Sequence, residues 1–330
     1  MLSKKRQGRQ RLFARRARLS GPALSIILIV YDMPAQAQRT VRSLLHGYQR
    51  DVASWDYELL IIENASANTL PRSFVDSLPP YCSYLLRDES RPTPVPAINE
   101  GLRLARGRNL CVMIDGARLV TPGVVKNLIR GHQISDQAVV TVPGYHLGKE
   151  LQQVAVGSGY SSEFEDELVA SIDWPQDGYR LFEIACFSGS CAHGFFLPHS
   201  ESNCISLTRK MWRELGGFDE RFDLRGGGLV NLDTYKRACE HPGAQHVFLH
   251  GEGTFHQFHG GVTTGGEDSQ VRQRYIDESM QQYADLRGAS YESPQTDPVY
   301  LGELSDYVQQ FVFLSTQKKL DRMRMMENNR

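Results

Sequence analysis

Apolar runs alternate with segments of helical periodicity between residues 24 and 132. The runs at 24–30 and 57–62 are continuous and rich in β-branched residues, which is typical of strands buried on both faces of a parallel sheet. Two further strands are predicted at 84–86 and 109–114, and helices at 35–48, 96–106 and 124–132. Alternation at this interval indicates βαβ units, so we expect an α/β fold built on a doubly wound sheet.

Polar residues follow these strands where each one ends. Asp32, Glu63, Asn64 and Asp115 all stand at a predicted carboxyl end, and ligands of doubly wound sheets bind at that edge. Each residue alone could be a turn former, but their convergence on one edge favours a ligand site. The first strand is followed by neither a Gly-x-Gly-x-x-Gly fingerprint nor a Walker-type loop, which argues against a dinucleotide or P-loop site.

The pattern is less regular between residues 150 and 200. We expect an inserted loop region over the sheet edge here, with the acidic run at 163–167 forming a solvated face. Order returns with a strand at 204–207, a helix through Trp212, and a helix at 232–239. Residues 267–330 are expected to form a C-terminal helical extension, with helices at 268–287 and 303–325.

Composition excludes several classes of protein. Of the 330 residues, 41% are hydrophobic and 23% charged, as in ordinary globular proteins. The apolar runs are shorter than the ~20 residues that a membrane-spanning helix needs. The six cysteines contain no Cys-x-x-Cys pair, and a zinc site at Cys186, Cys191, His193 and His199 would fit no standard spacing. A reducing, cytoplasmic location is therefore expected.

The net charge of −1 hides an asymmetry between the N-terminus and the rest of the chain. Residues 1–20 carry eight basic side chains and no acidic one, which leaves −9 on the remainder and argues against a nucleic-acid partner. We expect residues 1–22 to form a disordered, solvated arm. Peripheral contact of this arm with an anionic membrane is the alternative. No apolar stretch follows the bases to make a secretory signal.

Two histidines stand near a late glycine-rich turn. His256 and His259 occur in a strand-like segment, and their spacing of three predicts that they face opposite sides of the strand, so that only one points into a site. A structural pair in a turn is the alternative interpretation. The glycine-rich strip at 260–266 is either a lid or a surface loop.

Six short segments of the sequence follow one another in an order that is typical of one enzyme family. They read Ile26-Ile-Leu-Ile-Val-Tyr31, Ile61-Ile-Glu-Asn-Ala-Ser66, Asn99-Glu-Gly101 with Ala105-Arg-Gly107, Val112-Met-Ile-Asp-Gly116, Leu215-Gly-Gly-Phe-Asp-Glu220, and Gly226-Gly-Gly228 with Asp233-Thr-Tyr-Lys-Arg237. In this order, residues 24–265 resemble a family-2 glycosyltransferase with the GT-A fold. The resemblance implies a doubly wound mixed sheet flanked by helices at 23–266, with a nucleotide-binding half at 23–135 and an acceptor half at 136–266.

The resemblance also implies an activity and its partners. The expected enzyme is a hexosyltransferase of carbohydrate biosynthesis. It would move a sugar from a nucleotide-diphosphate donor to a glycan or other hydroxyl acceptor, with inversion, assisted by Mn²⁺ or Mg²⁺. The implied nucleotide contacts are Tyr31, Glu63, Asn64, Asn99 and Asp115. The implied metal ligands are Asp115, His256 and His259, with His256 favoured. Asp219, Glu220 and Asn203 would border the acceptor.

Two departures from the family pattern affect the chemistry. Ala117 replaces the second carboxylate of the Asp-x-Asp motif, which lowers the negative charge available to a metal. The position of the general base reads Asn231, and an amide cannot take a proton. Asp233 or Glu201 is therefore the candidate base, and Asn231 would instead hydrogen-bond the acceptor.

Three rival functions follow from the same residues. The first is a catalytically decayed nucleotide- or carbohydrate-binding module, suggested by Ala117 and Asn231. The second is a nucleotidyltransferase, which should carry a glycine-rich basic loop after the first strand. The third is a metal-dependent oxygenase that uses Asp115 and the two histidines, although such triads are expected on a barrel and this chain is α/β.

Overall fold

The computed structural model describes residues 21–89, 91–260 and 269–328. Most of the basic N-terminal arm and all but the first residue of the glycine-rich strip lie outside these ranges. The two features therefore stay predictions from the sequence.

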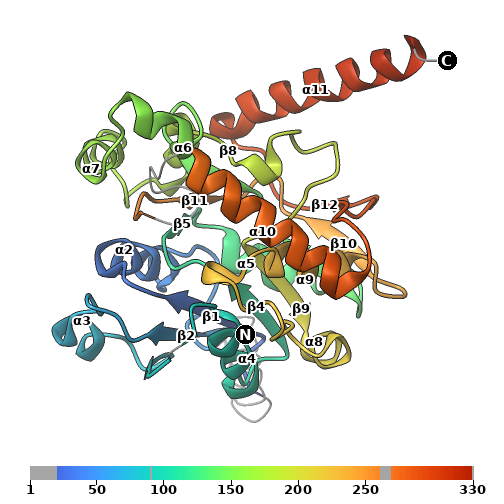
Figure 1. The fold of residues 1–330 in the computed structure, drawn as a ribbon. Coiled ribbons are helices and arrows are strands. Elements are labelled where there is room, and N and C mark those ends of the chain that lie inside the picture. The colour runs from blue at the N-terminus through green and yellow to red at the C-terminus, as the bar shows by residue number, and fades with distance from the viewer. Residues whose placement is uncertain (1–20, 90, 261–268, 329–330) are drawn as a thin grey trace, which may run out of the picture.

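An eight-stranded mixed sheet forms the centre of the fold (Figure 1). Its strand order is β12-β10-β6-β9-β4-β1-β2-β3. The strands are β1 (Leu24–Val30), β2 (Tyr57–Asn64), β3 (Cys82–Arg87), β4 (Asn109–Met113), β6 (Ala138–Thr141), β9 (Cys204–Thr208), β10 (Gln245–Phe248) and β12 (Val299–Tyr300). β9 runs antiparallel to β4 and β6, and the remaining pairs are parallel. The predicted α/β class and mixed sheet are confirmed.

Helices cover both faces of this sheet because alternate residues of its strands point to opposite sides. In β1, Ile26 and Leu28 face one apolar cluster, and Ile27 and Ile29 face the other. The first cluster is covered by α2 (Pro34–Leu44) and α5 (Val124–Gly131). The second is covered by α4 (Val95–Leu104), α8 (Arg209–Leu215), α9 (Val230–Cys239) and α10 (Ser269–Arg287).

The shorter helices lie around this frame. They are α3 (Arg72–Asp76), α6 (Gln152–Ala155), α7 (Ser162–Ala170) and the 3₁₀ turns η1 (Val156–Ser158), η2 (Gly178–Ile184), η3 (Gly189–Cys191), η4 (Arg225–Gly227) and η5 (Asp306–Val308). The last helix, α11 (Gln309–Asn328), projects from the body (Figure 1). In the ranges that the structure describes, no helix is both long and apolar enough to cross a bilayer.

A second, four-stranded sheet lies beside the first, in the order β5-β11-β7-β8. Its strands are β5 (Arg118–Val120), β11 (Thr254–His256), β7 (Gly144–Leu147) and β8 (Ala185–Phe187). An aromatic cluster supports it: the Tyr145 ring stacks on Phe255 with centroids 5.0 Å apart and on Phe187 at 5.4 Å. Phe311 of α11 packs edge-on against Tyr145, which fixes the start of the C-terminal helix to this sheet.

The prediction for residues 150–200 is wrong in two respects. The segment contains α6, α7 and β8 rather than only loop. Within the acidic run, Glu165 is fully buried instead of solvated. It shares an inward face of α7 with Val169, four residues later. Helical spacing thus places one carboxylate of the run inside the protein. The number of charges alone predicts that the whole run is exposed to solvent.

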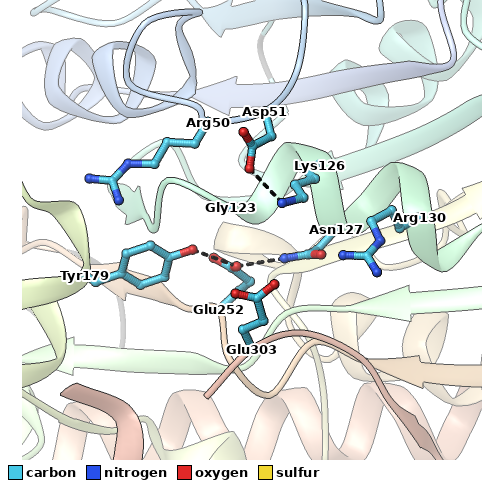
Figure 2. A pocket seen from close by; sticks show the side chains of 9 residues that line it. All are labelled: Arg50, Asp51, Gly123, Lys126, Asn127, Arg130, Tyr179, Glu252 and Glu303. Carbon is cyan, nitrogen blue, oxygen red and sulfur yellow. Dashed lines mark hydrogen bonds and ion pairs between the residues drawn. The ribbon is translucent and has the colours of Figure 1, made fainter. Parts of the chain in front are cut away.

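Glu252 ties the second sheet to the start of α5. Its carboxylate accepts hydrogen bonds from the Thr121 hydroxyl, from Asn127 Nδ2 at 2.8 Å and from the Tyr179 hydroxyl at 3.0 Å, as Figure 2 shows for the last two. A Cβ atom at Gly123 would lie 2.1 Å from Glu252 Oε1, so this approach requires glycine. The Glu252 carboxylate forms one wall of a cavity of about 170 Å³. Its hydrogen bonds give it a structural role.

Replacing Glu252 tests this role. Glu252→Ala should lower the free energy of unfolding by about 3 kcal/mol, because the buried Thr121 and Asn127 and the partly buried Tyr179 lose their acceptor. Glu303→Ala is the matched control, since Glu303 lines the same cavity but is exposed. Urea unfolding of the two variants measures the difference. Equal stability of Glu252→Ala and the control would contradict a structural role for Glu252.

Candidate metal and nucleotide site

Asp115, His256 and His259 converge at the edge where β4 ends. Asp115 follows β4, and His256 is the last residue of β11. His256 Nε2 lies 3.2 Å from Asp115 Oδ2, and His259 Nε2 lies 3.7 Å from Asp115 Oδ1. The two Nε2 atoms are 3.2 Å apart. Within the described ranges, these three residues form the one group of three or more potential ligands whose ligand atoms all lie within 4.8 Å of one another.

Both histidines face Asp115, so the prediction that only one points into the site is wrong. Alternation of side chains holds only along an extended strand, and β11 ends at His256. The next residue, Gln257, is turned inward: its backbone N–H donates to Ala117 O at 2.8 Å and its amide to Thr40 Oγ1 at 3.0 Å. The chain then bends, which brings His259 back to the carboxylate.

Gln152 sets the tautomer of His256. Its amide N–H donates to the backbone oxygen of His256 at 3.0 Å and to Glu165 Oε2 at 3.1 Å, which assigns the amide orientation. Its oxygen therefore faces His256 Nδ1, at 2.5 Å, and accepts a hydrogen bond from it. The proton of a neutral His256 is then on Nδ1, and the lone pair of Nε2 points at Asp115.

The charges of the site follow from burial. Burial lowers the pKa of His256 to about 4 in spite of the nearby Asp115, so the imidazole is neutral near pH 7. Burial alone would raise the pKa of Asp115, but the basic groups around it, of which Arg118 is charged at every pH, hold that pKa well below its usual range. An ionised carboxylate and a neutral imidazole thus present lone pairs to each other, an arrangement that a bound cation would stabilise.

Arg118 brings a permanent positive charge into contact with this group of residues. Its side chain is 7% exposed, and its Nε lies 3.3 Å from Asp115 Oδ2. Two of its nitrogens, Nε and Nη1, are buried without a hydrogen-bond partner. Strand pairing explains its position, because Arg118 of β5 is directly opposite His256 of β11. No local pattern in the sequence marks Arg118, since pairing of β5 with β11 joins residues 138 positions apart.

Glu165 and Gln152 were also missed by sequence reasoning. Glu165 accepts hydrogen bonds from Phe258 N at 2.8 Å and the Tyr160 hydroxyl at 2.9 Å. Burial raises the pKa of this carboxyl to about 7. Gln152 and Glu165 both fasten the turn that carries the two histidines, through His256 O and Phe258 N. The i, i+4 spacing of Glu165 and Val169 could have indicated the buried carboxylate, whereas nothing local distinguishes Gln152.

The expected nucleoside contacts at the end of β2 are at the same edge. Val30 pairs with Glu63, and Leu28 pairs with Met113, two residues before Asp115. Glu63 is fully buried and accepts from Leu70 N at 3.1 Å and the Tyr84 hydroxyl at 2.7 Å. The other two candidates differ in exposure: Asn64 is buried and accepts from Arg87, whereas the Tyr31 side chain is exposed.

Asn99 is not brought to this cluster. It exchanges hydrogen bonds with the backbone of Phe218, donating to O at 2.9 Å and accepting from N at 3.0 Å. Gly217 has φ +72°, and a Cβ there would lie 2.6 Å from Asn99 Oδ1. The structure thus explains Asn99 and the pair Gly216-Gly217 by a structural role: together they hold the 215–220 segment in place.

Three acceptor-side candidates lie together beside β9. Asn231 Nδ2 donates to Glu201 Oε2 at 2.6 Å, and Asn203 Nδ2 donates to Glu201 Oε1 at 3.4 Å. Cys204 of β9 pairs with Met113 of β4 in antiparallel register. Residues before Cys204 and after Met113 therefore leave the sheet at one edge, which places this trio on the side of Asp115.

The remaining acidic candidates are held by arginines. Asp233 is 1% exposed and accepts from Arg237 Nε at 2.7 Å and Arg287 Nε at 2.6 Å. Asp219 accepts from Arg221 and Arg287, and the first of these arginines contributes most to a lowered pKa of its carboxyl. Glu220 accepts a 3.4 Å hydrogen bond from Asn99. The bonds from Arg287 to Asp233 fasten α10 to α9, and both oxygens of Asp233 already accept from arginines.

The zinc site considered from the sequence is not formed. All six cysteines are free thiols, and Cys186, Cys191, His193 and His199 do not group as metal ligands in the described part of the chain.

Comparisons with known proteins return solved structures only. Neither a scan against protein-family models nor a search of curated proteins gives a match. The mannosyltransferase PcManGT from Pyrobaculum calidifontis, in complex with GDP-Man and Mn²⁺, has 14% identity and a TM-score of 0.49, over 96% of this chain and 79% of its own. TarS from S. aureus has 9% identity and a TM-score of 0.42, over 80% and 72%. The complex of TarS with UDP has 10% identity and a TM-score of 0.47, over 79% of this chain and 72% of its own.

Because the identities and TM-scores of these three structures are low, the similarities do not assign a family to the chain.

The buried histidines predict loss of stability in acid. Burial lowers the pKa values of five histidines to between about 2 and about 4: His132, His146, His199, His246 and His256. The unfolded chain then binds protons more tightly, so stability falls as the pH drops from about 6.5 towards 4. Glu165, with its raised pKa, opposes this weakly. Urea midpoints at pH 7, 6, 5 and 4 measure the effect, expected to exceed about 2 kcal/mol; a constant midpoint would contradict it.

Proposed function

We propose that this chain is a glycosyltransferase of the GT-A type, which moves a sugar from a nucleotide-diphosphate donor to an acceptor hydroxyl. The observation that carries the proposal is the convergence of Asp115, His256 and His259, with the lone pair of His256 Nε2 facing Asp115, at the carboxyl edge of a mixed α/β sheet. The family motifs of the sequence support the same assignment. The family-2 and hexosyltransferase descriptions, and an acceptor that is a glycan, belong to this proposal.

The donor set fits a divalent cation. Asp115 would supply a carboxylate oxygen, and His256 and His259 would each supply an imidazole nitrogen. Two nitrogen ligands among three favour Mn²⁺ over Mg²⁺, which prefers oxygen ligands. A bound cation would act as a Lewis acid that stabilises the departing nucleoside diphosphate. Gln152 would keep Nε2 of His256 free for it by holding the proton on Nδ1.

The rest of the edge would receive the two substrates. We assign the nucleoside to the surface beside Tyr31, whose ring is exposed for stacking, above the buried pair Glu63 and Asn64. Glu201 would accept the proton of the acceptor hydroxyl, and Asn231 would orient it through their 2.6 Å hydrogen bond. Direct attack assisted by one base inverts the anomeric carbon.

Two rivals use the same residues. An oxygenase would share the set of two histidines and one carboxylate, but a buried arginine beside that carboxylate favours an anionic ligand such as a diphosphate. A decayed binding module remains the alternative because Ala117 leaves one carboxylate where the family has two. Binding of a nucleotide without turnover of any donor would favour that module.

Thermal unfolding with UDP, GDP, dTDP and CDP, each with and without Mn²⁺, tests the nucleotide and the metal together. One nucleotide should raise the melting temperature of the wild type only when Mn²⁺ is present, since a ligand that binds the native state stabilises it. Asp115→Asn and His256→Ala should lose this shift. Asp136→Asn and His46→Ala are matched controls on exposed positions. Absence of a shift with every nucleotide would contradict the proposal.

Replacement of Glu201 tests the base. Glu201→Gln should lower the rate of sugar transfer by about 10²–10⁴-fold, because the amide cannot take the proton. Its Mn²⁺-dependent nucleotide shift should equal that of the wild type. Glu163→Gln, at an exposed position, is the control. Unchanged transfer by Glu201→Gln would exclude Glu201 as the base.

A further inference from the structure

The charge balance around Asp115 is unusual for a metal site. Asp115 is the only carboxylate among the three grouped residues, and the two histidines add no negative charge. Arg118, with Nε 3.3 Å from Asp115 Oδ2, cancels the single negative charge. At the position of the family's second carboxylate stands Ala117, which is fully buried and donates its N–H to Asp115 Oδ1 at 3.0 Å. A free divalent cation would therefore meet a site whose formal negative charge is already cancelled.

Arg118 is built into this position. Its backbone N–H donates to Thr40 Oγ1 at 2.9 Å, and its strand pairs with the strand of His256. A Cβ at Gly144, on the next strand beyond β11, would lie 3.8 Å from Arg118 Nη1. The guanidinium thus reaches from β5 towards Gly144 of β7 and lies beside Asp115. The ion pair uses little of its hydrogen-bonding capacity, since Nε and Nη1 are buried without an acceptor.

We propose that Arg118 makes metal binding at Asp115, His256 and His259 depend on a diphosphate, so that the protein takes the cation as a metal–nucleotide complex rather than alone. This inference rests on the proposed function for the identity of the anion. The guanidinium repels a lone cation and attracts phosphoryl oxygens. With the diphosphate present, its negative charge compensates both the cation and Arg118. The two ligands then bind with positive coupling, which acts equally in both directions.

A purely structural role for Arg118 makes a different prediction. If the residue only held the fold of the site in place, its removal would misplace the ligand side chains and weaken the binding of every ligand at the site. In our proposal the removal has opposite effects on the two ligands. Arg118→Met should bind Mn²⁺ alone more tightly by at least about tenfold, because a repelling charge is lost. It should bind the nucleoside diphosphate more weakly, by about tenfold or more, because a charged donor is lost.

The experiment measures binding in solution for the full chain. Mn²⁺ alone is titrated by electron paramagnetic resonance. The nucleoside diphosphate that stabilises the wild type most is titrated by calorimetry, in EDTA and with saturating Mn²⁺. For the wild type, the affinity for Mn²⁺ should rise by about 100-fold when the nucleotide is present. A rise of less than about threefold would overturn the inference, whatever the variants do.

Two further variants separate charge from folding. Arg118→Lys keeps the positive charge and should leave the affinity for free Mn²⁺ close to that of the wild type. Arg130→Met removes an exposed arginine and should change neither titration. Weaker binding of both Mn²⁺ and nucleotide to folded Arg118→Met would also overturn the inference.

The same titrations distinguish failure of this inference from failure of the proposed function. If no nucleotide binds, the proposed function fails, and the inference fails with it. If the nucleotide binds and Mn²⁺ alone binds as tightly as with nucleotide, the glycosyltransferase assignment stands and the role of Arg118 is wrong.

Discussion

The site depends on one electrostatic conflict: an ionised carboxylate and a neutral imidazole face each other with lone pairs, 3.2 Å apart, where the imidazole is buried and the carboxylate half-buried. Burial keeps His256 neutral, and Gln152 keeps its proton on the far nitrogen. Buried lone pairs that oppose each other cost free energy unless something positive lies between or beside them. In this chain Arg118 offers part of that compensation and a bound cation would offer the rest.

Two sheets are needed to create this conflict. The large sheet delivers Asp115 at the end of β4, and the small sheet delivers His256 at the end of β11 and Arg118 at the start of β5. The small sheet keeps its place through the aromatic cluster around Tyr145 and through the carboxylate of Glu252. The site therefore rests on this packing, and loosening of the packing would misplace the histidines.

The sequence predicts those elements of the fold that a continuous local pattern of residues marks. The continuous apolar run at 24–30 coincides with β1. Asp115 could be selected because it is a polar residue just after a predicted strand, and it does lie beside His256. What the sequence could not predict depends on pairing across long distances. β5, β7 and β11 are short, with three or four residues each, and they join segments more than 100 residues apart. Arg118, Gln152 and Glu165 acquire their positions from those contacts, so no local pattern marks them as neighbours of His256.

Anomalous diffraction from crystals soaked with Mn²⁺ and a nucleoside diphosphate would show whether Asp115, His256 and His259 hold a metal ion together. We expect a strong manganese peak bonded to Asp115, His256 and His259, with the phosphoryl oxygens on the same ion. A manganese peak at another place in the protein, or a nucleotide bound at this edge with the three side chains free of metal, would contradict it.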